Sequence, residues 1–170
     1  MGQQQLLLLV LGMVIVGIAV VAGIQAFSEG RQKAATDAAV SDALRIATDI
    51  QAWVLKPKAF GGGGGNANGL NFQKLGYPKK EASGVYGYDG STPTQYITPN
   101  GCFILSGNAL GSTDPLSASN TVVITAKETC SSTTEYAKVT IKGTNVDNIE
   151  TVVNTSGTGG GTGGGTGGGM

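Results

Sequence analysis

The sequence predicts an α+β fold, in which a long N-terminal α-helix packs on a small antiparallel β-sheet head and a Gly-rich C-terminal tail follows. Three observations support this prediction. Residues 6–27 are almost continuously apolar, and Gln25 is the only polar side chain among them. An apolar pattern with helical spacing then runs from Val40 to Val54. From about Val85 onward apolar and polar residues alternate, which is typical of half-buried strands.

The same patterns divide the chain into four segments. An apolar helix of membrane length (1–27) continues into an amphipathic half (28–56). A β-rich globular head (57–154) and a Gly/Thr-rich tail (155–170) follow. Pro57 is expected to end the helix, because proline disfavours helix at the preceding residue and cannot continue the hydrogen-bond ladder.

The apolar segment is long enough to cross a membrane. Leu6 to Ile24 is 19 residues, or about 28 Å as a helix, close to the hydrocarbon thickness of a bilayer. A cleaved signal peptide is the alternative, but residues 1–5 carry no basic side chain, which favours retention of the helix. Arg31 and Lys33 would place the head in the cytoplasm by the positive-inside rule, whereas the cysteine pair favours an exported head, which we expect.

Composition argues against several classes of function. The formal net charge is zero, so no basic surplus exists for dedicated nucleic-acid binding. The chain has no histidine, and neither a cysteine–base pair nor a metal-ligand cluster is visible, so we expect no enzyme activity, no cofactor and no metal site. The glycine run 61–65 lacks the lysine and helix start of a phosphate-binding loop. It is expected to be flexible or to pack closely against another subunit.

Two cysteines, Cys102 and Cys130, allow one disulfide in an oxidising compartment. We favour a disulfide over two buried thiols. A bridge between them would contribute roughly 3 kcal/mol in the chain-entropy model.

In the head, strands are expected at 102–105, 121–126, 136–142 and 149–153, separated by Gly and Asn clusters. The second half of the helix is expected to pack on this sheet through one stripe, which consists of Val40, Leu44, Ala47, Ile50 and Val54. Ile46 and Trp53 lie off this stripe, and we expect them at the edge of the head or against a neighbour.

The N-terminal 55 residues resemble the type IV pilin and pseudopilin family. If Met1 is the first mature residue, Leu6 to Val21 corresponds to the family's apolar stretch, and residues 22–24 fall where pilins often carry Pro-Ala-Tyr. Phe27 falls on a common aromatic position. The sequence departs from the family at Gln5, where a glutamate is usual, because glutamine can hydrogen-bond but cannot neutralise charge. The helix-kinking proline is also absent.

This resemblance implies a structural subunit of an extracellular type IV pilus-like filament on the cell surface. The helix would leave the inner membrane, with help from pilus assembly machinery, and enter a central bundle of identical helices. The assembly interface would consist of Gln5, Leu6, Leu9, Met13, Val14, Val16, Val20, Ile24 and Phe27. The alternatives are a pseudopilin of a type II secretion-like machine and a monomeric, membrane-anchored binding module.

The tail carries candidate glycosylation sites. Thr158, Thr162 and Thr166 are spaced by four residues, and Asn154 begins an N-linked sequon. The tail is expected either to be flexible or to pack in extended form along a neighbouring subunit, where extensive hydrogen bonding would offset the entropy that glycine loses on ordering.

Overall fold

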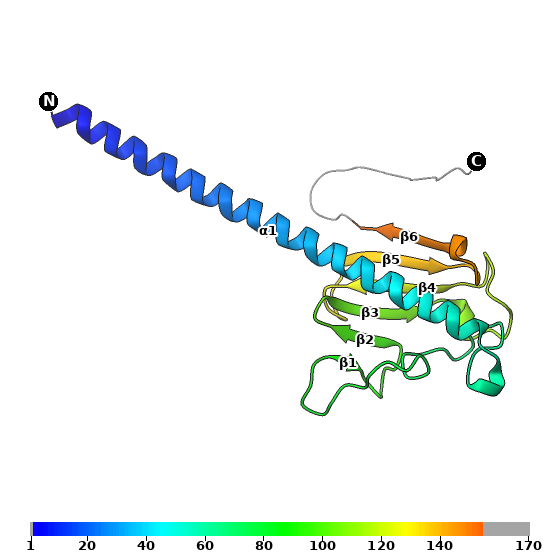
Figure 1. Cartoon of the computed structure of the whole chain (residues 1–170). Coiled ribbons are helices and arrows are strands. Elements are labelled where there is room, and N and C mark those ends of the chain that lie inside the picture. The colour runs from blue at the N-terminus through cyan, green and yellow to red at the C-terminus, as the bar shows by residue number, and fades with distance from the viewer. Residues whose placement is uncertain (1, 155–170) are drawn as a thin grey trace, which may run out of the picture. The chain divides into compact units, whose positions relative to one another are not determined.

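The computed structural model describes residues 2–154. The chain forms two compact units, residues 1–37 and the unit that begins at Ala38, and the boundary falls inside the long helix α1. The expectations for the tail, including Thr158, Thr162 and Thr166, lie outside the described residues. The α+β fold predicted from the sequence is confirmed (Figure 1).

Helix α1 runs from Gly2 to Leu55 and ends two residues before Pro57, as expected. Residues 2–34 of the helix are exposed along their whole length. In the second unit, the last turns of α1 lie across the sheet (Figure 1). Here Ala43, Ile50 and Val54 are fully buried in one core with Phe103 and Val139 of the sheet.

The sheet is a six-stranded antiparallel meander in which every strand pairs with its sequence neighbours. Its strands are β1 (Gly87–Tyr88), β2 (Gln95–Thr98), β3 (Gly101–Ser106), β4 (Val122–Lys127), β5 (Glu135–Ile141) and β6 (Ile149–Val153). Three short 3₁₀ helices, η1 (Lys58–Phe60), η2 (Asn108–Leu110) and η3 (Val146–Asn148), lie in the connections. Alternate residues of β5 face the core: Ala137, Val139 and Ile141 are buried, whereas Lys138 is exposed.

The strands predicted at 102–105, 121–126, 136–142 and 149–153 are confirmed as β3 to β6. Strands β1 and β2 were not predicted, because β1 has only two residues and β2 is half-buried throughout, so neither shows a clear alternation.

The prediction for the buried face of α1 was partly wrong. Ile46 and Trp53 belong to the core, with exposed fractions of 2% and 9%, whereas Leu44 is 38% exposed. Ala47, Ile50 and Val54 of the predicted stripe are buried as expected, and Ala39 and Ala43, which were not predicted, also have no exposed surface. Small side chains at the alanine positions allow the helix backbone to approach the sheet closely. The buried face is therefore rotated from the Val40–Leu44 side toward the alanines.

The glycine-rich loop caps the end of α1. The backbone N–H groups of Gly63, Gly64 and Gly65 donate to the carbonyls of Trp53, Lys56 and Val54 at 2.9, 2.9 and 2.8 Å. Carbonyls at a helix C-terminus otherwise have no intrahelical partner. A Cβ at Gly63 would lie 2.0 Å from the Asn66 carbonyl oxygen and 2.6 Å from the Trp53 ring. The close packing expected of this loop is thus made with the helix of its own chain.

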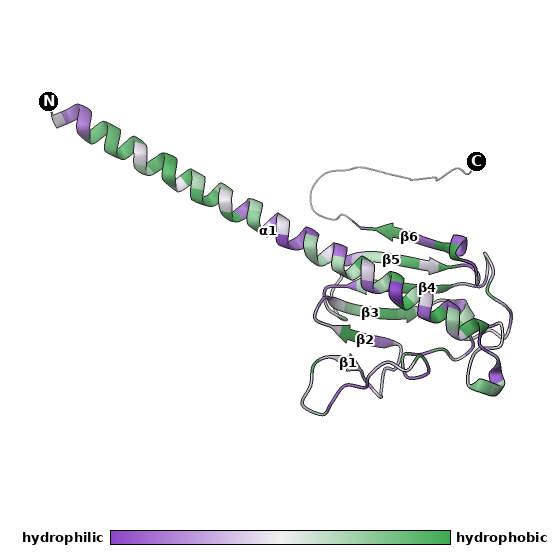
Figure 2. Cartoon of the chain, viewed as in Figure 1, coloured by the Kyte–Doolittle hydropathy of each residue, from purple (hydrophilic) through white to green (hydrophobic). Residues whose placement is uncertain are grey.

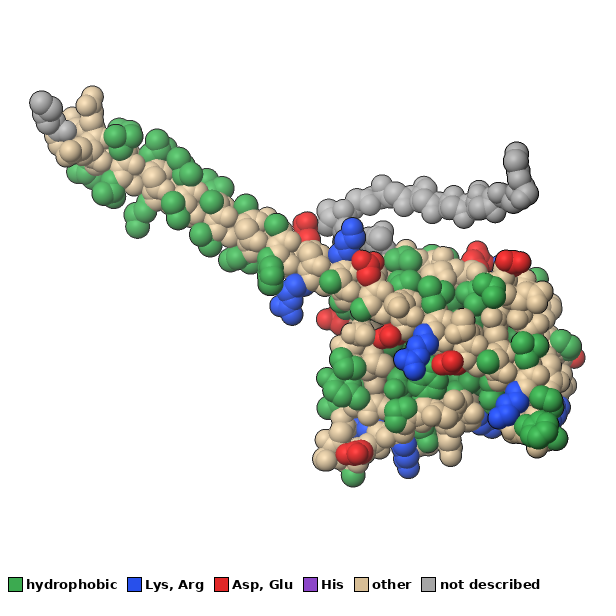
Figure 3. All heavy atoms as spheres, viewed as in Figure 1, with side chains coloured by type: hydrophobic (Ala, Val, Ile, Leu, Met, Phe, Trp, Pro, Cys, Tyr) green, Lys and Arg blue, Asp and Glu red, His purple; other side chains and the backbone are tan. Residues whose placement is uncertain are grey.

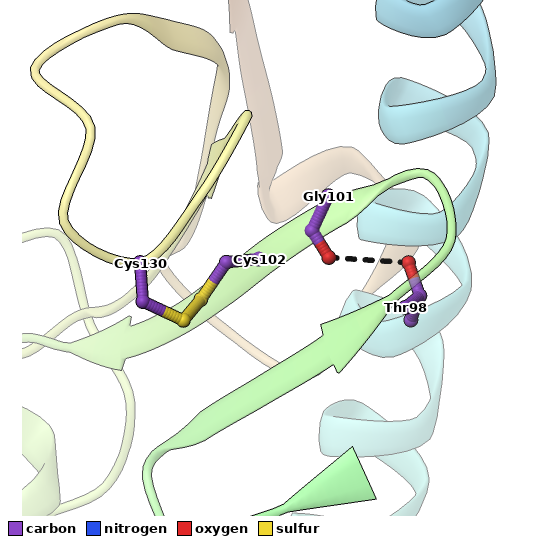
Figure 4. Close-up of a disulfide and its surroundings, with 4 residues drawn as sticks. All are labelled: Thr98, Gly101, Cys102 and Cys130. Atoms are coloured by element: carbon purple, nitrogen blue, oxygen red, sulfur yellow. Dashed lines mark hydrogen bonds between the residues drawn. A yellow bond between two sulfur atoms is a disulfide. The ribbon is translucent and has the colours of Figure 1, made fainter. Parts of the chain in front are cut away.

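The disulfide expected from the two cysteines is present and joins Cys102 of β3 to Cys130 in the connection after β4 (Figure 4). Cys102 is buried. Close by, the Thr98 hydroxyl donates to the Gly101 carbonyl at 3.2 Å across the turn between β2 and β3. The bridge therefore ties the centre of the sheet to the loop that leads into β5.

Replacing Cys130 by serine in the full chain is expected to lower the free energy of unfolding of the head by about 3 kcal/mol, because the unfolded chain regains the entropy of an open loop. The measurement is urea unfolding of the oxidised wild type, the reduced wild type and Cys130→Ser. The reduced wild type and Cys130→Ser, which both lack the bridge, should unfold at the same urea concentration. Equal midpoints for all three would show that the bridge contributes no stability.

Candidate assembly interface

The N-terminal part of α1 presents apolar side chains to the outside in every direction. The large hydrophobic residues between Leu6 and Phe27 keep between 51% and 75% of their surface exposed. Figure 2 shows hydrophobic colouring on all visible sides of these turns, and Figure 3 shows the side chains projecting from them. Soluble helices normally confine apolar residues to one stripe, and a helix that is apolar all round is typical of a lipid or protein-buried environment.

The residues expected at the assembly interface fall on neighbouring parts of this surface. Seven of them follow one another at intervals of three or four, which places them on one helical face: Leu6, Leu9, Met13, Val16, Val20, Ile24 and Phe27. Val14 lies off this face, rotated by about 100° from Met13 around the helix axis, and Gln5 is exposed in the second turn of the helix. The structure brings these side chains together by helical periodicity alone.

Glycines interrupt the apolar surface without any packing reason inside the described chain. A Cβ added at Gly12, Gly17 or Gly23 would meet nothing within 4 Å. Each glycine costs the helix about 1 kcal/mol relative to alanine in water. A shallow notch surrounds Gly17 and is lined by Val14, Gly17, Ile18, Val21, Ala22 and Gln25. Small residues of this kind let a second helix approach closely.

Helix α1 is the one helix among the described residues that is long and apolar enough to cross a membrane. An N-terminal signal sequence has the same character, so the helix indicates membrane anchoring or export. The Cys102–Cys130 disulfide fits an oxidising, extracellular compartment.

No family model, curated protein or solved structure matches this chain.

The head contains a groove of about 680 Å³ between the second half of α1, the 74–78 loop and strands β2 and β3. Aromatic rings form one wall. The Tyr77 and Tyr96 ring centroids lie 4.9 Å apart in an edge-to-face arrangement, and Phe72 lies 5.4 and 5.2 Å from them. Such pairs contribute about 0.5–1.5 kcal/mol beyond the area that they bury.

Charged side chains, including Asp42, Arg45, Asp49 and Lys74, also line this groove. The Tyr77 hydroxyl donates to Asp49 Oδ2 at 2.6 Å. Burial, and then this hydrogen bond to a carboxylate, raise the pKa of Tyr77 above its usual value. The Asn100 amide donates to Asp42 at 2.7 Å, and Lys74 Nζ lies 6.0 Å from the Trp53 ring centroid. The buried Trp53 indole N–H has no hydrogen-bond partner among the described residues.

Sequence reasoning missed this groove. Its residues come from one helix, one loop and two strands, and no motif of fixed spacing joins Asp49 to Tyr77 or Tyr96. Only the three-dimensional fold brings them together.

The other groups considered as possible binding sites are engaged in local hydrogen bonds. The amides of Gly63 to Gly65 are bonded to helix carbonyls and are not free to hold a phosphate. The Asp114 carboxylate accepts from the Ser112 hydroxyl at 3.2 Å in an exposed loop. No group of three or more potential metal ligands occurs in residues 2–154.

Proposed function

We propose that this protein is a structural subunit of an extracellular type IV pilus-like filament, which assembles through its N-terminal apolar helix. The observation that carries the proposal is the all-round apolar surface between Leu6 and Phe27, on a helix that continues without a break to Leu55. The resemblance of the first 55 residues to pilins supports it.

The physical argument concerns the surroundings that such a helix needs. Water is excluded as a stable environment, because each large apolar side chain gains about 1.5–3 kcal/mol when it is buried. Lipid satisfies the helix before assembly, and a bundle of identical helices satisfies it afterwards. The glycines fit both stages, because they are tolerated in membrane helices and allow close packing between helices.

The glutamines at the N-terminus set a requirement on the assembly. Gln3, Gln4 and Gln5 are exposed in the described chain. An amide that enters an apolar interior without a hydrogen bond costs several kcal/mol. We expect side-chain or backbone partners for them on adjacent subunits, whereas in the membrane-bound subunit they lie at the water interface.

The experiment is reconstitution of the full chain. The protein is extracted from membranes in detergent, the detergent is removed, and the product is examined by sedimentation and electron microscopy. The proposal expects regular thin filaments made of this polypeptide alone. A protein that remains monomeric in every condition, or whose apolar helix is cleaved off during export, would contradict it.

Gly17→Ile is expected to weaken assembly strongly and leave the head unchanged. The added side chain meets open space in the single subunit but fills the notch that a neighbouring helix would enter. The measurement is the critical concentration for filament formation, which should rise at least about tenfold, or about 1.4 kcal/mol. Gly30→Ile is the matched control, because Gly30 is equally open but lies beyond the apolar segment. An equal rise for both variants would count against close helix packing at Gly17.

The head groove favours a second function, that of a membrane-anchored binding module. Its volume lies within the range of ligand-binding clefts, about 300–1,000 Å³, and aromatic and charged groups converge on it. Under this function, in which the chain stays monomeric, Tyr96→Ala would abolish ligand capture and leave membrane anchoring unchanged. Under the filament function alone, capture of small molecules by the wild type would not be observed.

A further inference from the structure

The two edges of the sheet are very different. Strand β1, at one edge, has only two residues. Strand β6, at the other edge, has five residues, and four of them are β-branched: Ile149, Thr151, Val152 and Val153. Natural proteins usually protect a sheet edge with charges, proline, bulges or short strands. The β1 edge is protected by its shortness, whereas β6 is a longer edge strand without proline (Figure 1 shows β1 and β6 at opposite edges of the sheet).

The single charge of β6 does not protect the edge. Glu150 pairs with Lys142 at 2.6 Å. The hydrogen bond and the charge of this lysine lower the pKa of the Glu150 carboxyl, and the lysine balances the one negative charge of β6. Val152 and Val153, in contrast, keep 58% and 42% of their surface exposed.

The hydrogen bonds of the β5–β6 ladder identify which backbone groups of β6 point outward. Lys142 N–H donates to the Asn148 carbonyl at 2.8 Å, and Asn154 N–H donates to the Tyr136 carbonyl at 2.9 Å. In an antiparallel ladder the hydrogen-bonded residues alternate. Even-numbered residues of β6 therefore bond to β5, and Ile149, Thr151 and Val153 direct their backbone groups away from it.

Most of these outward groups are unused in residues 2–154. The Ile149 N–H donates to the Val146 carbonyl at the end of η3. The Ile149 carbonyl and the N–H and carbonyl groups of Thr151 and Val153 have no hydrogen-bond partner among the described residues. No described strand pairs with that side of β6. A row of free donors and acceptors along an edge is the surface that β-augmentation uses, in which an extended segment adds a strand to a sheet.

The chain itself supplies a segment suited to this edge. Residues 155–170 follow β6 directly and consist mostly of glycine with regularly spaced threonines, without charge or proline. A segment so poor in side chains offers mainly backbone hydrogen bonds, and these are what the edge lacks. Fully extended, residues 155–170 would span about 50 Å. This length exceeds the width of a six-stranded sheet, which is about 30 Å.

The direction of the chain favours a second copy as the acceptor. The ladder continues through Asn154, so the described chain is still extended and leaves β6 along the strand direction. We propose that the outer edge of β6 is the docking site for residues 155–170 of a neighbouring copy, which add a seventh, antiparallel or parallel strand to the sheet. A contact between two different surfaces of identical copies propagates into a helical assembly when the rotation between copies does not close a ring. The inference rests on the proposed filament function.

A single substitution can remove the backbone N–H of Thr151, which is the middle one of the outward-facing N–H groups of β6. Thr151→Pro deletes the outward N–H of β6, and proline is tolerated on an edge strand where its nitrogen faces away from the ladder. Thr151→Val keeps the N–H and the β-branched shape and is the matched control. A second variant lacks residues 157–170 and changes no described residue. Slow amide exchange at Lys138 and Val152 verifies that the β5–β6 ladder survives in each variant.

The test is hydrogen exchange of the full chain in filaments and in detergent-dispersed subunits. In wild type and Thr151→Val, the Val153 amide should exchange roughly tenfold or more slowly in filaments than in dispersed subunits. Thr151→Pro and the truncated chain should both lose this protection, and combining the two changes should have no further effect. Equal exchange of Val153 in all forms would overturn the inference.

Mixed filaments distinguish a neighbouring copy from a hairpin within one chain. Isotopically labelled truncated subunits supply an intact edge, and Thr151→Pro subunits supply an intact tail. The Val153 amide of the truncated copy should become protected only in the mixture. If it stays unprotected while the wild type is protected at every dilution, the tail folds back on its own chain and the proposal is wrong.

The two proposals can fail separately. If filaments form but Val153 is unprotected, the edge inference fails and the filament function stands. If no filaments form, the filament function fails. In that case, protection of the Val153 amide that rises with protein concentration in detergent would still support docking at the β6 edge. The absence of such protection would reject it.

Discussion

Replacing Val14 by aspartate is expected to abolish filament assembly and leave the head folded. Val14 lies near the middle of the apolar segment, and a carboxylate there must enter first lipid and then the helix bundle. Insertion of an aspartate at a helix centre costs about 3 kcal/mol, which lowers the inserted population roughly a hundredfold. Intramembrane charges are rare for this reason. The measurement is the filament yield by sedimentation and electron microscopy.

Val14→Leu is the matched control, since it keeps the apolar character of the site and does not lower its helix propensity. It should assemble at a yield close to that of the wild type. Because Val14 is exposed in the single subunit, thermal unfolding of the head should be the same in both variants. Normal filaments from Val14→Asp would show that the apolar helix is not the interior of the assembly.

Ile46→Ala is expected to lower the free energy of unfolding of the head by about 2–4 kcal/mol, whereas Leu44→Ala should cost less than about 1 kcal/mol. Ile46 is 2% exposed within the core, and Leu44 is 38% exposed. Truncating a buried aliphatic side chain removes its transfer free energy and leaves a cavity. Both residues lie in the same helix and both are replaced by alanine, so the changes in helix propensity are similar in the two variants. Urea unfolding of the two variants provides the measurement.

The result decides between two faces of the same helix. The stripe read from the sequence, with Leu44, and the face seen in the structure, with Ile46, predict opposite rankings. A larger loss for Leu44→Ala would mean that the helix packs on the sheet through the stripe read from the sequence.

The difference between those faces shows what the sequence could and could not predict. The predicted stripe included Leu44, which is 38% exposed, but missed Ala39 and Ala43, which are fully buried beside the correctly predicted Ala47. Periodicity locates an amphipathic helix well, yet it assigns the buried face by hydrophobicity and not by size. Close packing against a sheet favours small residues, and their contribution is visible only once both surfaces are known.

The strands show the same limit of prediction from local sequence pattern. Val122–Lys127 and Glu135–Ile141 alternate clearly because one face is buried, and both were predicted. Gly87–Tyr88 and Gln95–Thr98 are short and half-buried, so tertiary pairing, not local pattern, determines them. The apolar surface from Leu6 to Phe27 was fully readable from the sequence, because it needs only a helix. The Tyr77–Asp49 hydrogen bond and the outward groups of Thr151 and Val153 required the fold.

The most direct test of the central claim is a side-chain-resolution electron cryo-microscopy map of filaments sheared from cells. Our account predicts a central bundle in which the apolar side chains from Leu6 to Phe27 of one copy contact only the same segment of other copies. A map in which this segment faces solvent, is missing from the mature chain, or is replaced at the centre by the heads would contradict it.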